Sequence, residues 1–197
     1  MRKILALMVL ASALAGCAFS EDIVDVSYPA PTAAPVAAAG PVGLSVLDQR
    51  TSDRARISTK INGYGMDMAA IRSNAPVPDI VRDALTAELK QRGFTVGAGG
   101  PPITVGVERF YNTFDFGFAS GTAKAQVDLA VTVGAANGGS GFAQKYSGTA
   151  EESVMAASGS NAAETLSKAL ADAIQKMFND NNFLQAVEAT KTTRTTS

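Results

Sequence analysis

Apolar and polar residues alternate strictly along residues 122–133. The odd-numbered positions from Ala123 to Val133 are all alanine, valine or leucine, whereas Lys124, Gln126 and Asp128 occupy even-numbered positions. A period of two is that of a β-strand, whose successive side chains point to opposite faces of the sheet. We therefore expect one face of this strand to be buried and the other to be solvated, which is typical of antiparallel sheets.

The same period predicts further strands at residues 43–48, 56–61 and 103–111, and shorter strands at 66–71 and 94–96. An Asn-Gly pair at positions 137 and 138 predicts a hairpin that leads into another strand at residues 142–155. The glycine-rich loop at residues 97–102 leads into a strand. It does not precede a helix, as a phosphate-binding loop would, so we expect no phosphate site there.

Two segments show the helical period instead. In residues 78–92, apolar side chains recur three and four positions apart, with Pro78 suited to the first turn and Gly93 to the C-terminal end. Residues 161–178 carry a second apolar stripe, and a last apolar turn follows at residues 183–187. Because each helix has one stripe to bury, the sequence predicts an α+β fold. A mainly antiparallel sheet of five to six strands would carry two amphipathic helices packed on one face.

The first seventeen residues have the features of a bacterial export signal. Arg2 and Lys3 precede an apolar run of about a dozen residues, too short for a spanning helix, which needs ~20. The run ends in Leu-Ala-Gly-Cys, which resembles the bacterial lipobox, where cleavage between Gly16 and Cys17 leaves an acylated cysteine as the new N-terminus. Cys17 is the only cysteine of the chain, so no disulfide competes for it. The alternative is an ordinary cleavable signal peptide with a cysteine nearby by chance.

These patterns divide the chain into four parts. We expect a signal peptide at 1–16, a lipidated N-terminus with a Pro/Ala-rich tether at 17–42, a single α+β domain at 43–188 and a disordered tail at 189–197. Because proline favours extended backbone, a tether of this length could hold the domain several tens of ångströms from a membrane, at ~3.1 Å per residue.

Composition narrows the chemistry that the chain can perform. The formal net charge is only −1, and no cluster of positive charge indicates a nucleic-acid surface. The chain contains no histidine, which is the commonest general base and the commonest metal ligand, and its one cysteine is assigned to lipid. We therefore expect no catalytic residue, no metal, no cofactor and no enzymatic activity.

Carboxylates are the remaining candidates for chemistry. Glu108 and Asp128 could share the solvated face of the sheet with Lys124, and glycoside hydrolysis uses a pair of carboxylates. Glu151 and Glu152 are adjacent in a strand and so point to opposite faces. Solvated charges on strands are the simpler interpretation of all four, and a carboxylate-only hydrolase is the alternative.

Four phenylalanines occupy even-numbered positions between residues 110 and 118. In an unbroken strand, Phe110, Phe114, Phe116 and Phe118 would continue the polar side of residues 103–111. Either a β-bulge shifts the register and buries them, or a row of aromatic rings is exposed near a hairpin end. Because exposed aromatic clusters mark contact surfaces, we hypothesise that Phe114, Phe116 and Phe118 bind a partner protein or a second copy of the chain.

Several of these features occur in the same order in one family. A lipobox and a proline-bearing spacer precede a strand that ends in Asp48-Gln49-Arg50, a helix that ends in Gln-Arg-Gly-Phe-Thr-Val-Gly at positions 91–97, and Lys-Tyr-Ser-Gly at 145–148. This order resembles that of the YajG-like lipoproteins of Gram-negative bacteria, from about Gly43 to Val187. The resemblance implies an envelope lipoprotein and supplies no catalytic residues, and the phenylalanines at 114–118 do not match the family pattern.

The sequence thus predicts a lipid-anchored envelope protein that is attached to the membrane through acylated Cys17. Ala18 follows the cysteine where aspartate would signal retention, and by resemblance to enterobacterial sorting this implies the outer membrane, with the domain facing the periplasm. We expect a non-enzymatic adaptor or assembly factor that binds a protein partner or self-associates. A binder of peptidoglycan or lipopolysaccharide is the main alternative.

Overall fold

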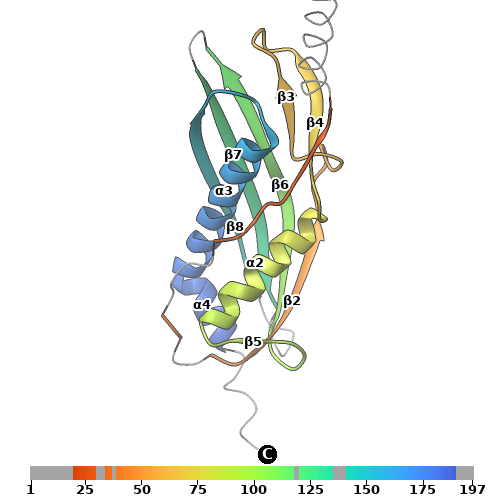
Figure 1. Ribbon diagram of the computed structural model, residues 1–197. Helices are drawn as coiled ribbons and strands as arrows, with labels where there is room; N and C mark the ends of the chain where they lie inside the picture. The colour runs from red at the N-terminus through yellow and green to blue at the C-terminus, as the bar shows by residue number, and fades with distance from the viewer. Residues whose placement is uncertain (1–19, 30–33, 37–38, 118–119, 135–140, 190–197) are drawn as a thin grey trace, which may run out of the picture.

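The computed structural model describes residues 20–29, 34–36, 39–117, 120–134 and 141–189 (Figure 1). The strands of this part are β1 (Asp22–Val24), β2 (Pro41–Asp48), β3 (Ser58–Ile61), β4 (Asp67–Ser73), β5 (Thr95–Val96), β6 (Pro102–Phe116), β7 (Gly121–Val133) and β8 (Phe142–Val154). Its helices are α2 (Val77–Gln91), α3 (Gly159–Asn179) and α4 (Asn181–Ala189). The prediction of an α+β fold is confirmed.

The larger sheet has five strands in the order β5-β2-β6-β7-β8. β6, β7 and β8 are antiparallel neighbours, as predicted, so that Val127 of β7 lies between Phe110 of β6 and Gly148 of β8. β2, however, is parallel to both β6 and β5. The prediction of a mainly antiparallel sheet is wrong for this half, because the crossover through α2 returns the chain to the end of the sheet where β2 began.

A second sheet, of three strands in the order β1-β4-β3, adjoins the second half of β6. The backbone N–H of Asn112 donates to the carbonyl of Ile57 (2.8 Å), and its side-chain amide donates to the hydroxyl of Ser58 (3.2 Å). The hydroxyls of Thr59 and Tyr111 are 3.0 Å apart. β2 and the start of β3 therefore follow one another along the same edge of β6, so the described strands form two mixed sheets and not the single sheet that was predicted.

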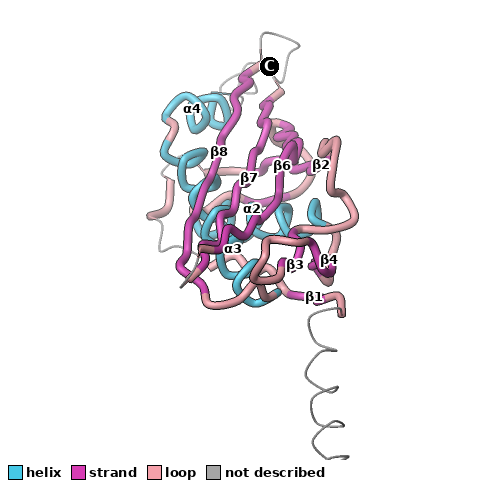
Figure 2. The backbone as a smooth tube through the Cα atoms, turned by 90° about the horizontal axis from the view of Figure 1, so that it is seen from above, coloured by secondary structure: helices cyan, strands magenta, loops and turns pink. Residues whose placement is uncertain are grey.

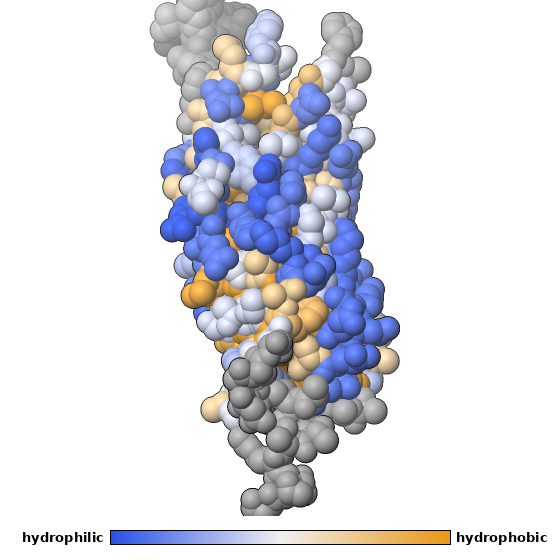
Figure 3. All heavy atoms as spheres, turned by 180° about the vertical axis from the view of Figure 1, so that it is seen from behind, coloured by the Kyte–Doolittle hydropathy of each residue, from blue (hydrophilic) through white to orange (hydrophobic). Residues whose placement is uncertain are grey.

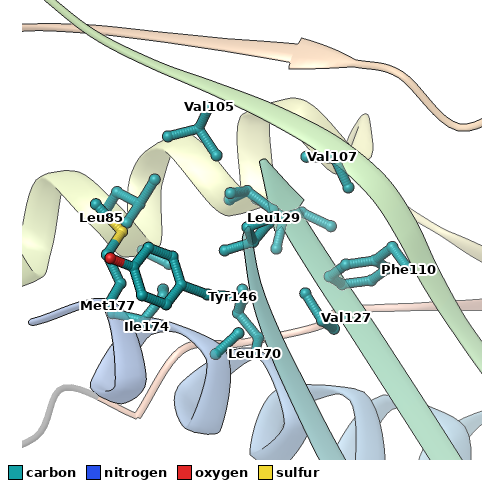
Figure 4. Packing of buried hydrophobic residues seen from close by; sticks show 14 of the residues in the cluster. Leu85, Val105, Val107, Phe110, Val127, Leu129, Tyr146, Leu170, Ile174 and Met177 are labelled. Atoms are coloured by element: carbon teal, nitrogen blue, oxygen red, sulfur yellow. The ribbon is translucent and has the colours of Figure 1, made fainter. Parts of the chain in front are cut away.

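α2 and α3 pack on the same face of the five-stranded sheet, as expected from their apolar stripes (Figures 1 and 2). The core lies between this face and the helices (Figure 4). Phe110 and Leu129 from the sheet, Leu85 from α2, and Leu170 and Ile174 from α3 are each at most 1% exposed. The predicted alternation of buried and solvated positions along β7 is confirmed.

α3 covers part of the free edge of β8. It approaches closely because Gly148 has no side chain, and a Cβ atom there would overlap the backbone of the helix. The backbone N–H of Thr149 donates to the carboxylate of Asp172 (3.0 Å), and Lys176 donates to the carbonyl of Ser147 (2.9 Å). These two side chains occupy backbone groups that an edge strand would otherwise offer to another chain.

The first described segment differs from the extended spacer predicted for residues 17–42. It forms β1 beside β4, Val26 is buried, and the hydroxyl of Tyr28 donates to the carboxylate of Glu88 on α2 (2.9 Å). Val42 is 1% exposed within β2, which begins before the predicted domain boundary. Apolar side chains and one tyrosine hydroxyl therefore hold much of this region on the domain.

The described chain has three helices where two were predicted. Asp180 adopts an extended conformation that ends α3, and the predicted last turn is a nine-residue helix, α4. Phe183 of α4 packs edge-to-face on Phe178 of α3, with ring centroids 5.4 Å apart. No helix within the described ranges is long and apolar enough to span a membrane. The predicted signal peptide, the lipidation site at Cys17 and the tail from residue 190 lie outside the described residues.

Candidate functional site

A β-bulge at Glu108 decides where the aromatic residues of β6 point. Val107 lies opposite Leu129 of β7 and Arg109 lies opposite Asp128, so Glu108 is the extra residue. The bulge shifts the register by one, and even-numbered residues beyond it face the core and not the solvent. This is the first of the two alternatives that the sequence left open.

The phenylalanines of β6 are less buried near its end than at Phe110. Phe110 is 1% exposed and belongs to the core. Phe114 is half-buried against the core, and Phe116 is half-buried with its ring lying over Gly121, its centroid 6.4 Å from that of Phe114. Phe118 lies outside the described residues. The hypothesis that Phe114, Phe116 and Phe118 bind a partner stays a prediction.

Phe116 lines a pocket of about 550 Å³ at the end of the domain. The pocket lies between the turn that joins β3 to β4 and the connection from β8 to α3. Met68, Phe116 and Met155 supply apolar side chains to it, and Asp22 and Lys60 supply charged ones. Met155 is 83% exposed. Seen from behind, hydrophobic residues gather at this upper end, above a middle region that is mostly hydrophilic (Figure 3).

The turn between β3 and β4 is organised by Asn62. Its side-chain oxygen accepts hydrogen bonds from the backbone N–H groups of Tyr64 (2.9 Å) and Met66 (3.0 Å), and its own N–H donates to the carbonyl of Met66 (3.0 Å). Gly65 has φ +77°, a left-handed conformation that glycine adopts without strain. The turn thereby holds two apolar side chains in solvent, with Tyr64 91% and Met66 57% exposed.

A polar cluster behind the pocket ties three elements together. Lys60 of β3 forms an ion pair with Asp22 of β1 (2.7 Å) and donates to the carbonyl of Ser20 (2.9 Å). The other oxygen of Asp22 accepts the backbone N–H of Gly159, the first residue of α3 (2.9 Å). Burial raises the pKa of Asp22, but the bonds from Lys60 and Gly159 outweigh it, so its pKa is lowered and the carboxylate is charged at neutral pH.

A second pocket, of about 350 Å³, lies at the start of α2 and is lined by four arginines. Arg56 pairs with Asp53 (3.0 Å), and Arg72 forms a two-pronged ion pair with Glu21 (2.9 Å for each bond). Arg54 donates only to backbone carbonyls in the described structure. The pocket is therefore rich in guanidinium groups, which are suited to binding carboxylate or phosphate.

Asp48 and Arg50, from the Asp-Gln-Arg sequence at the end of β2, line this second pocket. Arg50 is 4% exposed and makes a two-pronged contact with Asp48, with distances of 2.9 and 2.8 Å. These bonds hold the pKa of Asp48 below its ordinary value. Gln49 points the other way and covers Gly106 of β6, where a Cβ atom would overlap its amide. The three residues therefore have structural roles at the point where β2 ends and the next loop begins.

The candidate carboxylates of the outer face each have partners. Glu108 pairs with Lys145 (2.8 Å). Asp128 accepts hydrogen bonds from Ser147 (2.6 Å) and from the amide of Gln126 (2.9 Å). The structure therefore places Glu108 and Asp128 on adjacent strands of the solvated face, within a network of strand side chains.

Glu151 and Glu152 lie on opposite faces of β8, as predicted. Glu151 is exposed beside Lys124 of β7, and Glu152 pairs with Lys168 of α3 (2.5 Å). Lys124 forms a long ion pair with Asp115 (3.7 Å). Within the residues that the structure describes, no group of three or more acidic residues is arranged to hold a metal ion.

From the sequence, no function is predicted for the exposed turn residues Tyr64 and Met66, or for Met155. The signal for them was weak, because Tyr64 and Met66 stand among glycines and an aspartate, and Met155 only continues the apolar end of a strand. The arginine pocket was not predicted either, although Arg50, Arg54 and Arg56 occur close together in one loop. Their convergence with an arginine of β4 depends on the pairing of β3 with β4.

Comparison with protein-family models gives a match over residues 28–188, to a family described as uncharacterized lipoprotein. The chain belongs to this family. The YajG-like resemblance of the sequence is thereby confirmed, as is the classification as a lipoprotein. Comparison with curated proteins finds no match.

Two solved structures are similar to this chain over about three quarters of its length. One is a Xanthomonas campestris protein of family-model DUF330, with 13% identity and a TM-score of 0.49, covering 77% of this chain and 87% of that protein. The other is described as an uncharacterized protein, with 11% identity and a TM-score of 0.43, covering 77% of this chain and 92% of that one. Such low similarity gives no information about the binding partners or the activity of this chain.

Proposed function

We propose that the protein is a lipid-anchored adaptor or assembly factor without enzymatic activity. It is attached through acylated Cys17 to the outer membrane, on the periplasmic side, and binds another envelope protein at the pocket beside Phe116. The lipobox sequence around Gly16 and Cys17 and the membership of a lipoprotein family support the anchor.

The observation that carries the binding role is the open apolar pocket at the end of the domain. Its walls include Met68 and Met155, and methionine is flexible and polarizable, which suits surfaces that bind varied apolar groups. Phe116 adds an aromatic ring of the kind enriched in the centres of interfaces. A volume of about 550 Å³ is large enough for several apolar side chains of a partner segment.

Site-specific photocrosslinking in intact cells tests this role. A photoreactive residue at Met155, which is 83% exposed at the pocket, is compared with one at Thr132, which is exposed on the outer face of β7. We expect a discrete crosslinked product from position 155 and none from position 132. A product at twice the mass of the chain would identify a second copy as the partner. Equal labelling from both positions, or none from either, would contradict the proposed partner site.

The anchor is tested separately. Wild-type protein is expected to incorporate a labelled palmitate analogue in growing cells and to fractionate with the outer membrane. The variant Cys17→Ser is expected to do neither. A wild-type protein that incorporates no label would refute the lipid anchor. It would also remove the reason for placing the pocket at the outer membrane.

The arginine-lined pocket favours a second candidate, the binding of an anionic envelope ligand such as peptidoglycan or lipopolysaccharide. The variant Arg54→Gln removes a guanidinium whose hydrogen bonds, within the described residues, go to backbone carbonyls and not to a carboxylate. Arg82→Gln removes one that pairs with Asp79 elsewhere on α2, and so is the matched control. If the ligand binds here, retention on purified sacculi or lipopolysaccharide falls for the first variant only.

A further inference from the structure

The direction of β1 shows where the chain leads before the first described residue. β1 is parallel to β4, with Asp22 beside Ile71. β4 runs away from the turn at Met66, so the chain upstream of Asp22 leads back toward that turn. Ser20, two residues before Asp22, is the first described residue of this segment. The described chain therefore starts at the end of the domain that carries the exposed turn.

The chain between the domain and Cys17 is short. Ser20 is the first described residue, and three residues can span at most about 11 Å. Ser20 is itself held to β3, because its carbonyl accepts a hydrogen bond from Lys60, four residues before Tyr64. Whatever path these three residues follow, Cys17 lies within about 11 Å of Ser20, at the end of the domain that carries the turn.

The turn presents the side chains that a membrane interface accommodates. Tyr64 and Met66 are 91% and 57% exposed, and hydrogen bonds to Asn62 fix the backbone that carries them. Tyrosine is enriched where membranes meet water, because its ring is apolar and its hydroxyl remains hydrated. A rigid turn also loses little conformational freedom when it enters an interface.

We propose that the β3–β4 turn, through Tyr64 and Met66, rests in the headgroup region of the bilayer that holds the acyl chains of Cys17. The proposal rests on the lipid anchor proposed above and adds a second point of contact to it. Two contacts orient a domain, whereas a single flexible anchor does not. The pocket beside Phe116 then opens next to the membrane surface. A partner protein would therefore bind the pocket at that surface.

The absence of tryptophan from the chain provides the test. Tyr64→Trp places a single tryptophan on the turn, and Leu47→Trp places one at a position on β2 that is 49% exposed. Each acylated variant is reconstituted into vesicles of phosphatidylethanolamine and phosphatidylglycerol whose acyl chains carry bromine near the headgroup. We expect fluorescence at position 64 to be quenched several-fold more than at position 47, with a blue-shifted emission.

The outcomes separate this inference from the proposed anchor. Mass spectrometry and vesicle flotation show whether Cys17 is acylated and inserted. Acylated protein that floats with the vesicles but shows equal quenching at positions 64 and 47 overturns the membrane contact and leaves the anchor intact. Protein that is not acylated in cells overturns both. The variant Cys17→Ser in the Tyr64→Trp background is expected to lose the quenching, because the turn alone adds too little apolar area to hold the domain.

Discussion

Replacing Tyr28 by phenylalanine tests whether the N-terminal segment is docked on the domain. The hydroxyl of Tyr28 donates to Glu88 of α2 (2.9 Å), whose side chain is fully buried. The other oxygen of Glu88 accepts from Arg92 (2.7 Å), and the guanidinium of Arg92 lies over the ring of Phe178, 4.7 Å from its centroid. Tyr28→Phe removes one donor from a buried carboxylate and changes little else.

The cost follows from that carboxylate. A hydrogen bond to a charged group contributes ~1.5–3 kcal/mol to the free energy of unfolding. Tyr28 is only half-buried, so water can reach part of the vacated space, and the lower end of this range applies, about 1.5 kcal/mol. For a domain of this size, 1 kcal/mol shifts the melting temperature by ~2–4 °C, so a decrease of about 3–6 °C is expected.

The assay is thermal and urea denaturation of the mature chain carrying Cys17→Ser, which avoids the lipid. Tyr64→Phe is the matched control, because the Tyr64 side chain is 91% exposed, and its stability is expected to equal that of the parent. Burial and the hydrogen bond to Glu88 both raise the pKa of Tyr28. The contribution of the Tyr28 hydroxyl to the free energy of unfolding is therefore complete below the ordinary tyrosine pKa of about 10 and is lost as the pH rises further. The stabilities of the parent and of Tyr28→Phe should therefore converge at high pH.

Equal stabilities of the parent and Tyr28→Phe at neutral pH would refute the docking of this segment. Hydrogen exchange gives an independent reading. In the parent, the backbone amides of β1 that pair with β4 should be protected to a similar degree as those of β4. Rapid exchange in β1 beside slow exchange in β4 would show that the segment detaches in solution.

Three further substitutions test the packing and the charge network by urea denaturation. Gly148→Ala should cost about 3 kcal/mol, because its methyl group would overlap the carbonyl of Ala169 on α3. Phe110→Ala should cost ~3–5 kcal/mol, since the ring is 1% exposed in the core. Asp48→Asn should cost about 2 kcal/mol at pH 7, less than for a fully buried pair because Asp48 is partly exposed. The pKa of Asp48 is lowered in the folded state, so this last difference should be present above pH ~4 and vanish as the pH falls further.

The strand faces could be predicted because their signal is local. Along β7, each side chain alternates between core and solvent as its sequence alternates, and no distant residue changes that. The direction of β2 could not be predicted in this way. A strand with one buried face looks the same whether its neighbour is parallel or antiparallel, and only the crossover through α2 decides.

The sequence of β6 indicates the position of the bulge, because its apolar residues change from odd-numbered to even-numbered positions. The sequence does not show that a bulge is the reason. The buried positions are odd-numbered as far as Val107 and even-numbered from Phe110, so the change of parity required an extra residue between them or an exposed aromatic row. The sequence alone does not decide between these two alternatives. In the structure, the pairing of β6 with β7 contains the bulge. Phe110 therefore faces the core below α3, where its large ring fits.

The N-terminal segment was predicted as a spacer because proline and alanine dominate its composition. What holds it is not visible locally: the acceptor for Tyr28 is on α2, sixty residues away, and the partner of Asp22 is Lys60. An acidic side chain buried in a helix, such as Glu88, signals that a donor must come from elsewhere in the fold. The sequence shows the glutamate on the apolar side of a helix but not which donor satisfies it.

Under the proposed lipid anchor, the docked segment changes how the domain is presented at a membrane. A free spacer from residue 17 to residue 42 would let the domain tumble, and the pocket beside Phe116 could meet partners at any height above the surface. With β1 paired to β4 and Ser20 bonded to Lys60, the free length under the proposed lipidation of Cys17 is three residues, about 11 Å at most. A partner that binds this pocket must then approach along the membrane plane, and lengthening the chain by a flexible insert directly before Ser20 should reduce crosslinking from Met155 while leaving the fold and the anchor unchanged.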